Sequence, residues 1–456
     1  MSKALLDFIN QNEKTYVEEL RELLRKPSIS AQNIGIRETA DWIVHYMESL
    51  GMKAQIYPMA DGHPVVFGEL NGESDKSILF YNHYDVQPPE PLELWESEPF
   101  SADIRDGKIF SRGVADNKGC LMARLQAVKA ILQTRGKLPV SVKFLVEGEE
   151  EIGSPHLKSF VDAHRDLLRS DLCIWENAYG DEDGSPTIRL GNKGMCYVEL
   201  SIQSMKSDTH SKNATIYPNA AWEMIWALST LKDSNENILI EGFYDRVVDP
   251  GPEEVAVIKR VPIQEEKIKA RAGVDKLLRD VHGYEIINAM YNFPTCTVCG
   301  FQSGYTGVGQ KTVLPAKAVV KLDMRLVPNQ DPDDILDKLL SHFRKNGFDN
   351  IKIQVLTKAY PSKTPVTDPA ISYIYEMGVK AYDKKPVIEP LSTGTGPRYI
   401  FSSWTDMPMV ALGVSNAGSN PHAPNENIYL SDFLSGIKHV ALIIDGFSDF
   451  AKRKRV

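Results

Sequence analysis

Two stretches of alternating helix and strand patterns, separated by a stretch of another kind, constrain the fold of this chain most strongly. Through the first 195 residues, amphipathic helical spacing alternates with short apolar runs, which is typical of a largely buried α/β sheet. From about residue 197 the order becomes β-α-β-β-α-β with an insertion near residues 233–292, which predicts a ferredoxin-like layer. After about residue 365 the first pattern returns. We therefore expect an α/β domain, residues 1–195 and 365–456, interrupted by an α+β domain, residues 196–364.

The apolar spacing places the individual elements. In the α/β domain it predicts helices at residues 13–25, 37–50, 118–134, 155–168, 368–382 and 431–448, and strands at 64–67, 77–81, 140–146, 171–175 and 408–414. In the inserted domain it predicts strands at residues 197–202, 297–301, 318–326 and 351–356, and helices at 218–231 and 331–344.

The composition excludes several classes of protein. Among 456 residues, 52 Lys and Arg stand against 61 Asp and Glu, so the net charge of −9 argues against general nucleic-acid binding. Apolar runs fall far short of the ~18 residues of a membrane span, and the charged N-terminus does not resemble a signal peptide. Five cysteines are too few for a disulfide framework, so we expect a reducing cytoplasm.

Two smaller features have simple interpretations. The basic run at residues 452–455 is typical of a solvated terminus, with a targeting or anion-binding patch as the alternative. The pair Cys296 and Cys299 has the spacing of a redox motif, but it lies within a predicted strand. Alternation along that strand would point the two thiols mostly apart, so we do not expect redox or metal chemistry there.

Acidic residues and histidines follow four of the predicted strands, at the point where each strand ends. In chain order they are His83 and Asp85, the glutamates within residues 147–151, Glu176, and His422 after a Gly/Asn/Ser loop. Asp116 lies just before a predicted helix. Because sites in open α/β sheets lie at the carboxyl ends of strands, these side chains are expected in one crevice. A mixed nitrogen and oxygen set without cysteine suits Zn²⁺, Co²⁺ or Mn²⁺ rather than a closed structural zinc site.

Each of these residues also has a purely structural interpretation. His83 and His422 could be ordinary hydrogen-bonded histidines, and Asp116 could be the N-cap of the helix at residues 118–134. The glutamates at 147–151 could form a solvated acidic turn. The convergence of five candidate ligands from separate strand ends and a helix start favours the metal site.

Several long motifs resemble the M20 family of di-zinc peptidases, in particular the branch that contains cytosolic nonspecific dipeptidase and carnosinase. The motifs are HYD at 83–85, RGVADNKG at 112–119, EGEEEIGS at 147–154, KTVLP at 311–315, DMRLVP at 323–328 and PHAPNE at 421–426. They occur in the family's order from about residue 10 to the end of the chain. The resemblance implies a zinc-peptidase-like catalytic domain with a mixed sheet flanked by helices. It also implies an inserted ferredoxin-like lid and dimerisation domain, in a cytoplasmic homodimer.

The resemblance also implies two divalent ions per subunit, with zinc favoured and manganese or cobalt as alternatives. Their ligands would be His83, Asp116 as the bridging carboxylate, Glu151, Glu176 and His422. Asp85 would hold the ring of His83, and Glu150 would be the general base for a metal-bridging water. Family members have a cis peptide after the bridging aspartate, which here is the bond between Asp116 and Asn117.

The substrate-binding residues come from the resemblance as well. His210 would reach the active site of a partner subunit and stabilise the oxyanion, although a loop histidine without a role is the alternative. Arg325 would bind the substrate carboxylate, for which a guanidinium fork is suited, although it could be a strand arginine paired on the sheet surface. Thr312 and Thr395 would line the same pocket.

We therefore expect a metal-dependent hydrolase that cleaves the amide bond of dipeptides or short peptides with a free C-terminal carboxylate. Two departures keep an N-acyl-amino-acid deacylase or carboxypeptidase open. Glu176 stands where the family's dipeptidases usually have Asp, and residues 393–397 read TGTGP where the cytosolic dipeptidases have Gly-Gly-Ser. An inactive peptide-binding relative is the alternative of another class, and the presence of all five ligand positions with Glu150 argues against it.

Overall fold

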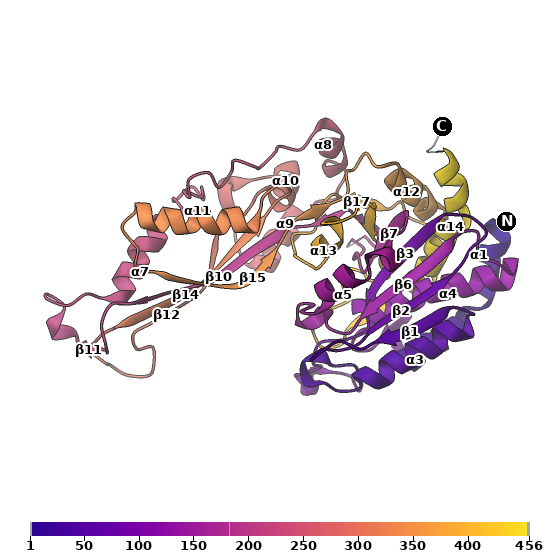
Figure 1. Ribbon diagram of the computed structural model, residues 1–456, viewed down its shortest axis with the longest axis horizontal. Helices are drawn as coiled ribbons and strands as arrows, with labels where there is room; N and C mark the ends of the chain where they lie inside the picture. The colour runs from indigo at the N-terminus through magenta and orange to yellow at the C-terminus, as the bar shows by residue number, and fades with distance from the viewer. Residues whose placement is uncertain (1, 182, 454–456) are drawn as a thin grey trace. The chain divides into compact units, whose positions relative to one another are not determined.

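The computed structural model describes residues 2–181 and 183–453 and divides the chain into two compact units (Figure 1). The first unit comprises residues 1–191, 364–390 and 400–456. The second comprises residues 192–363 and 391–399, so a short segment from the last third of the chain packs with the inserted part.

An eight-stranded mixed sheet forms the centre of the first unit. Its order is β1 (Lys53–Tyr57), β2 (Val65–Leu70), β6 (Ser141–Glu147), β3 (Ser77–His83), β7 (Leu172–Trp175), β18 (Met409–Ala411), β8 (Thr187–Arg189) and β17 (Val387–Glu389). The strands β6, β3, β7 and β18 run parallel to their neighbours in that order. Their carboxyl ends therefore meet at one edge of the sheet, as the sequence predicts.

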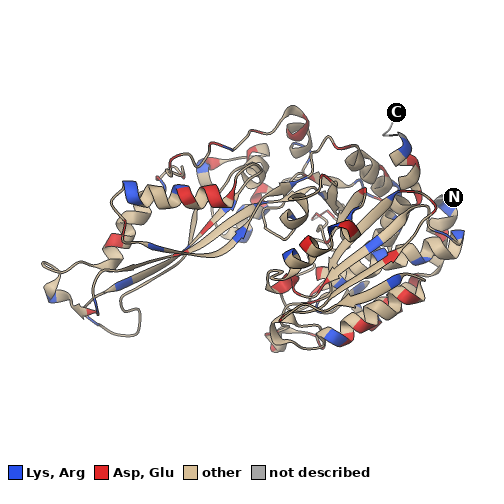
Figure 2. Ribbon diagram, in the orientation of Figure 1, with Lys and Arg blue, Asp and Glu red and all other residues tan. Residues whose placement is uncertain are grey.

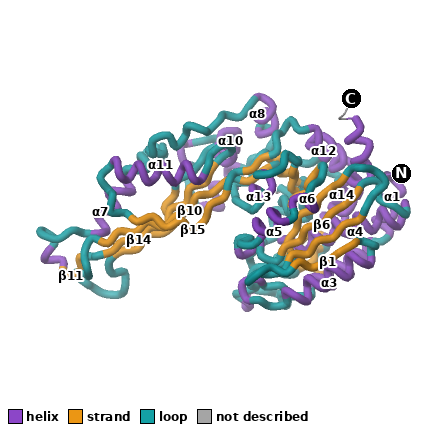
Figure 3. Tube along the Cα trace, viewed as in Figure 1, coloured by secondary structure: helices purple, strands orange, loops and turns teal. Residues whose placement is uncertain are grey.

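Helices lie along this sheet (Figure 3). They include α1 (Ser2–Gln11), α2 (Glu13–Leu24), α3 (Ile36–Ser49), α4 (Gly119–Arg135), α12 (Pro369–Ala381) and α14 (Leu430–Arg453). Helix α4 is buried on almost every side, because α1, α2 and α14 pack around it. Its apolar residues and those of the sheet share one large core.

The second unit contains a four-stranded antiparallel sheet of order β12 (Thr297–Ser303), β14 (Lys317–Leu326), β10 (Gly194–Gln203) and β15 (Lys352–Ala359). With α7 (Ala220–Ser229) and α11 (Pro332–Lys345) it has the β-α-β-β-α-β order of the expected ferredoxin-like layer. Burial alternates along β10 and β14, and their buried residues share a core with both helices. The insertion near residues 233–292 contains α8 (Pro252–Ile258), α9 (Glu265–Ala272) and α10 (Tyr284–Asn292).

The predicted fold class is confirmed, with local differences. The helix predicted at residues 155–168 is broken into α5 (Leu157–Ala163) and α6 (Arg165–Leu168). Its break is His164, whose φ of −127° is not helical and whose ring packs on Tyr57 and Phe160. Cys296 is buried just before β12 and Cys299 is exposed within it, but exposure does not alternate along β12, so strand alternation does not explain the difference.

Charge and apolar content add two observations. Basic and acidic residues are interspersed along both units in the view of Figure 2. Within residues 2–181 and 183–453, no helix has the length and apolar content that crossing a bilayer requires. The basic C-terminal run extends past the structure, since Lys454 and Arg455 lie outside the described residues.

Candidate metal centre

Strand register places the first candidate ligands together. His83 is the last residue of β3 and lies opposite Glu147, the last residue of the parallel strand β6. Glu176 directly follows β7, the neighbour of β3 on its other side. Asp116 lies in a non-helical bend just before α4, with φ of −135° and ψ of 90°, and the peptide bond to Asn117 is cis, as the resemblance implies.

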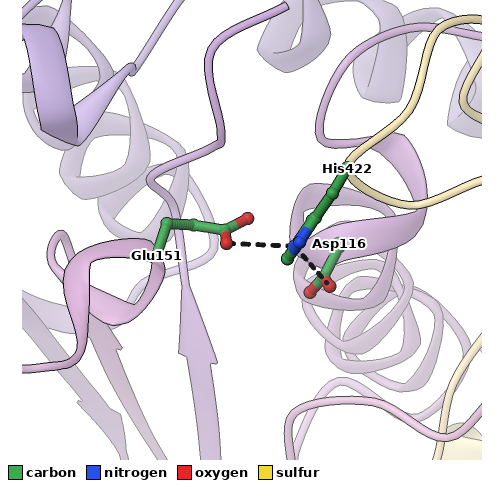
Figure 4. A group of neighbouring side chains, drawn as sticks. All are labelled: Asp116, Glu151 and His422. Carbon is green, nitrogen blue, oxygen red and sulfur yellow. Dashed lines mark ion pairs between the residues drawn. The ribbon is translucent and has the colours of Figure 1, made fainter. Parts of the chain in front are cut away.

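Asp116 is the centre of the cluster. Its Oδ1 lies 3.1 Å from His83 Nε2, and its Oδ2 lies 3.6 Å from His422 Nε2. Glu151 Oε2 lies 3.1 Å from the same nitrogen of His422. Figure 4 shows the side chains of Asp116, Glu151 and His422 pointing towards one another, and one donor atom of each lies within 4.8 Å of the other two. Each oxygen of Asp116 therefore faces a different histidine.

Asp85 connects the histidine side of the cluster to the glutamates. It is fully buried, and its Oδ1 lies 3.5 Å from His83 Nδ1. The same carboxylate accepts hydrogen bonds from the backbone N–H groups of Glu150 at 3.2 Å and Glu151 at 3.0 Å. One buried aspartate thus orients a candidate ligand ring and the segment that contains the proposed base.

Burial raises the pKa of two further carboxyl groups, those of Glu150 and Glu176. Desolvation raises the pKa of Glu150 well above its usual range, and the nearby Glu176 adds to this shift. Desolvation also raises the pKa of Glu176 to about 7. Glu176 Oε1 accepts a hydrogen bond from Trp175 Nε1 at 3.3 Å, whereas its Oε2 is buried and has no hydrogen-bond partner among the described residues.

These observations fit divalent cations. Two imidazole nitrogens and several carboxylate oxygens are the donors that zinc, manganese and cobalt accept. The unpartnered oxygen of Glu176 is a buried polar atom that a bound cation would satisfy. Within the described residues, only Asp116, Glu151 and His422 form a group of three donors at 4.8 Å; His83 and Glu176 do not complete a second group at that spacing.

The structural interpretations of Asp116 and of the glutamate run do not hold. Helix α4 begins after Lys118 with no side-chain cap, so Asp116 does not serve as its N-cap. The glutamate run is not a solvated turn, because Glu147 is 1% and Glu149 is 4% exposed. Glu147 accepts hydrogen bonds from Tyr81 and Ser154, and the Glu149 carboxylate lies 2.8 Å from His156 Nδ1.

A buried ion pair that sequence reasoning left without a role shapes the bend at Asp116. Arg112 NH1 lies 2.7 Å from Glu426 Oε2, and both side chains are 1% exposed. The other oxygen of Glu426 accepts hydrogen bonds from the backbone N–H groups of Ala115 at 2.8 Å and Asp116 at 3.1 Å. Arg112 lies in the motif at residues 112–119 and Glu426 in the motif at residues 421–426. Their place in these motifs was the sequence signal that could have identified them.

Sequence reasoning also missed Arg124 of α4, which is 1% exposed. Its guanidinium donates to Tyr81 O at 2.7 Å, Asn82 Oδ1 at 2.8 Å, Trp175 O at 2.5 Å, Glu176 O at 2.7 Å and Leu412 O at 3.0 Å. It therefore joins the ends of β3 and β7 and the residue after β18. The only signal in the sequence was an arginine within an apolar helix.

Two further side chains contact the cluster without having been predicted. The hydroxyl of Tyr179 donates to Asp116 Oδ2 at 3.1 Å. The amide of Gln87 donates to Glu151 Oε2 at 3.0 Å. Each contact holds one carboxylate in place, and neither residue stands out in the sequence.

The remaining predicted residues belong to the second unit, where they form two pairs. His210, in β11 (Thr209–His210), is exposed, and its Nε2 lies 3.5 Å from Thr312 Oγ1. Arg325, in β14, donates from NH1 to Thr395 Oγ1 at 3.0 Å and from Nε to Asp323 Oδ2 at 3.1 Å. Its side chain is 29% exposed, and no hydrogen bond from its NH2 group is found among the described residues.

Comparison with known proteins identifies the family. The model of peptidase family M20/M25/M40 matches residues 79–446. A crystal structure of the M20 family metallo-carboxypeptidase Sso-CP2 from Sulfolobus solfataricus is 42% identical, covers 94% of this chain and 98% of its own, and has a TM-score of 0.88. The Cys-Gly metallodipeptidase dug1 of Schizosaccharomyces pombe is 27% identical, over 95% of this chain and 96% of its own. The Beta-Ala-His dipeptidase of Rattus norvegicus is 26% identical, over 92% and 86% respectively. The chain therefore belongs to peptidase family M20/M25/M40 and is a metallopeptidase.

Proposed function

We propose that this protein hydrolyses the amide bond of dipeptides or short peptides that have a free C-terminal carboxylate. The observation that carries the proposal is the position of Asp116, whose two oxygens face two different histidines, as a carboxylate shared by two cations would require. The names of the related Cys-Gly metallodipeptidase and Beta-Ala-His dipeptidase support a dipeptide substrate.

His83 and Glu176 would hold one ion, Glu151 and His422 would hold the other, and Asp116 would contact both. We propose zinc as the metal, with manganese or cobalt as alternatives, because the donors are nitrogen and oxygen without sulfur. When bound, the ions would lower the pKa of a water molecule and polarise the scissile carbonyl.

Glu150 is the proposed general base. Its backbone is anchored to Asp85, and its side chain is not among the proposed ligands. It would take a proton from the attacking water and pass it to the leaving amine, so one carboxylate would serve as base and then as acid. Burial raises the pKa of Glu150 above its usual range, which makes the carboxylate a stronger base than an exposed glutamate.

The second unit would bind the substrate. Arg325, next to Thr395, would accept the C-terminal carboxylate, and the exposed imidazole of His210, next to Thr312, would donate to the oxyanion. We propose that His210 serves a metal centre outside its own unit, because the group of three metal donors found within the described residues belongs to the first unit.

We propose a homodimer in which His210 acts on the partner subunit. Helix α7 exposes an apolar stripe of Trp222, Ile225 and Trp226, which are 53%, 42% and 55% exposed, and the two indoles stack at 6.0 Å. Edge strand β12 exposes Val298 and Phe301. A second copy that meets the same surface about a two-fold axis would cover both features. All five cysteines are free thiols, which supports our placement of the enzyme in the cytoplasm.

A carboxypeptidase is the second candidate, favoured by Glu176 and by the likeness to the Sulfolobus metallo-carboxypeptidase. A turnover panel with Zn²⁺ or Mn²⁺ separates the candidates. We expect unblocked dipeptides to be cleaved faster than N-acetyl amino acids and faster than C-terminal residues of longer peptides. Faster release of the C-terminal residue from longer peptides would show that the protein is a carboxypeptidase. Faster cleavage of N-acetyl amino acids would show that it is a deacylase. If the metal-loaded protein cleaves none of these substrates, the proposal of catalysis is refuted.

A further inference from the structure

Lys193 is a buried lysine between β9 (Gly191–Asn192) and β10, and the proposed mechanism does not use it. Its side chain is 3% exposed. The ammonium donates one hydrogen bond, to Phe293 O at 2.6 Å. Among the described residues, no carboxylate lies within ion-pair distance of it. An ammonium has three donors, so two of its hydrogens lack a partner there.

The backbone of Lys193 is joined to the loop that contains Thr395. Its N–H lies 3.0 Å from Gly394 O and 3.2 Å from Ser392 O. The next carbonyl, Gly194 O, accepts a hydrogen bond from the Thr395 hydroxyl at 3.4 Å. Lys193 is therefore fixed to the loop whose threonine contacts Arg325.

Arg325 and Lys193 also share the segment before β12. Lys193 bonds to Phe293 O, and two residues further on Thr295 exchanges two hydrogen bonds with Arg325: its N–H lies 2.9 Å from Arg325 O, and its hydroxyl oxygen lies 3.2 Å from Arg325 N. On the sheet, Arg325 pairs with Met195, which is two residues after Lys193 in the chain.

This part of the second unit has an unbalanced positive charge. Asp323 is paired with Arg325, whereas Lys193 has no carboxylate to balance it. Burial lowers the pKa of Lys193 to about 8, and the nearby charge of Arg325 contributes, so Lys193 is still largely protonated at pH 7. A buried cation without a counter-ion is unfavourable, and one entering carboxylate would neutralise it.

We propose that Lys193 is a second cation of the substrate-carboxylate site and determines its preference for a free C-terminal carboxylate over an uncharged end. This inference rests on the proposed function, because it assigns the carboxylate of that substrate to Arg325 and Lys193 together. Arg325 offers a partly exposed, directional fork. Lys193 supplies a buried charge that an amide or ester end of the substrate cannot neutralise.

The test compares glycyl-leucine with glycyl-leucinamide on the metal-loaded enzyme. In Lys193→Met, we expect KM for glycyl-leucine to rise about tenfold with kcat within about twofold, whereas kcat/KM for glycyl-leucinamide stays within about twofold. Lys193→Arg should recover most of the lost preference. Lys143→Met is the matched control, because Lys143 Nζ also bonds only to backbone carbonyls, Leu167 O and Arg169 O, in the first unit.

A binding measurement separates this inference from the proposed function. Calorimetry with leucine and leucinamide needs no turnover, and we expect wild type to favour leucine and Lys193→Met to lose about tenfold in that preference. If wild type cleaves neither dipeptide but shows this pattern, the proposed function is wrong and the role of Lys193 stands. If Lys193→Met affects the acid and the amide equally, or changes only the melting temperature, Lys193 is merely structural and the inference is overturned.

Discussion

Replacement of Arg124 by Met tests whether a buried guanidinium holds the edge of the sheet at which the candidate ligands meet. The five acceptors of Arg124 lie at the ends of β3 and β7 and just after β18. Methionine fills much of the same volume but donates no hydrogen bond. The substitution therefore removes five hydrogen bonds at this edge of the sheet, of whose acceptors Glu176 O keeps a second donor, Asn117 Nδ2 at 3.2 Å, while the apolar packing changes little.

The expected loss can be worked from these bonds. Each unsatisfied buried acceptor costs about 1–3 kcal/mol. Removal of a buried charge offsets part of that total, because the desolvation of the guanidinium is no longer required. We expect Arg124→Met to lower the free energy of unfolding of the first unit by about 3–5 kcal/mol. Arg135→Met, in the same helix, removes a partly exposed partner of Asp445 and should cost about 1 kcal/mol or less.

Urea unfolding followed by near-ultraviolet circular dichroism gives the stability, and metal analysis of the native variant gives the ions bound per subunit. Because Arg124 contacts the backbone carbonyl of Glu176, we expect Arg124→Met to bind less than two ions at metal concentrations that saturate wild type. A variant within about 1 kcal/mol of wild type that keeps both ions would refute this account of Arg124.

Four further outcomes are expected. Glu150→Gln should keep both metals by elemental analysis and lose about 10²–10⁴-fold in kcat, because only proton transfer is removed; loss of metal would contradict its role as a base. Mixed Glu150→Ala and His210→Ala dimers, after proven subunit exchange, should recover about a quarter of wild-type activity, since half of the dimers are mixed and half of their sites are intact; no recovery would exclude action across the dimer. The double variant Trp222→Glu and Trp226→Glu should sediment as a monomer, and an unchanged dimer would place the interface elsewhere. Burial lowers the pKa of His439 to about 4, below the pKa of about 6.5 for a histidine in the unfolded chain. The contribution of His439 to the free energy of unfolding should therefore be complete above pH 6.5 and fall by about 3 kcal/mol towards pH 4. An equal fall in His439→Gln would show that other groups cause it.

The strand-end residues could be predicted because their placement depends on one rule. Parallel strands bring their carboxyl ends together, so His83 and Glu176 could be assigned to one crevice before any coordinates were known. The fold class could be predicted from helix and strand periodicity, because both patterns are local in the sequence. His210 and Arg325 came from the family resemblance alone, because neither lies at a position that periodicity distinguishes.

Arg124 and Lys193 could not have been predicted. A single cation in an apolar stretch does not indicate which carbonyl groups it will meet, and the acceptors of Arg124 come from segments up to 288 residues away. The environment of Lys193 depends on the loop near Thr395, just over 200 residues later in the chain. Such contacts are set by tertiary packing, for which a single sequence contains no local signal.

Because the loop at residues 391–399 belongs to the second unit, the chain crosses the boundary between the two units four times rather than twice. The chain passes from one unit to the other after residues 191, 363, 390 and 399. A fragment of residues 192–363 would therefore lack Thr395, the hydrogen-bond partner of Arg325. Grafting that fragment onto another catalytic unit would transfer the sheet without a complete carboxylate site, so any exchange of specificity between relatives must replace two separate segments together.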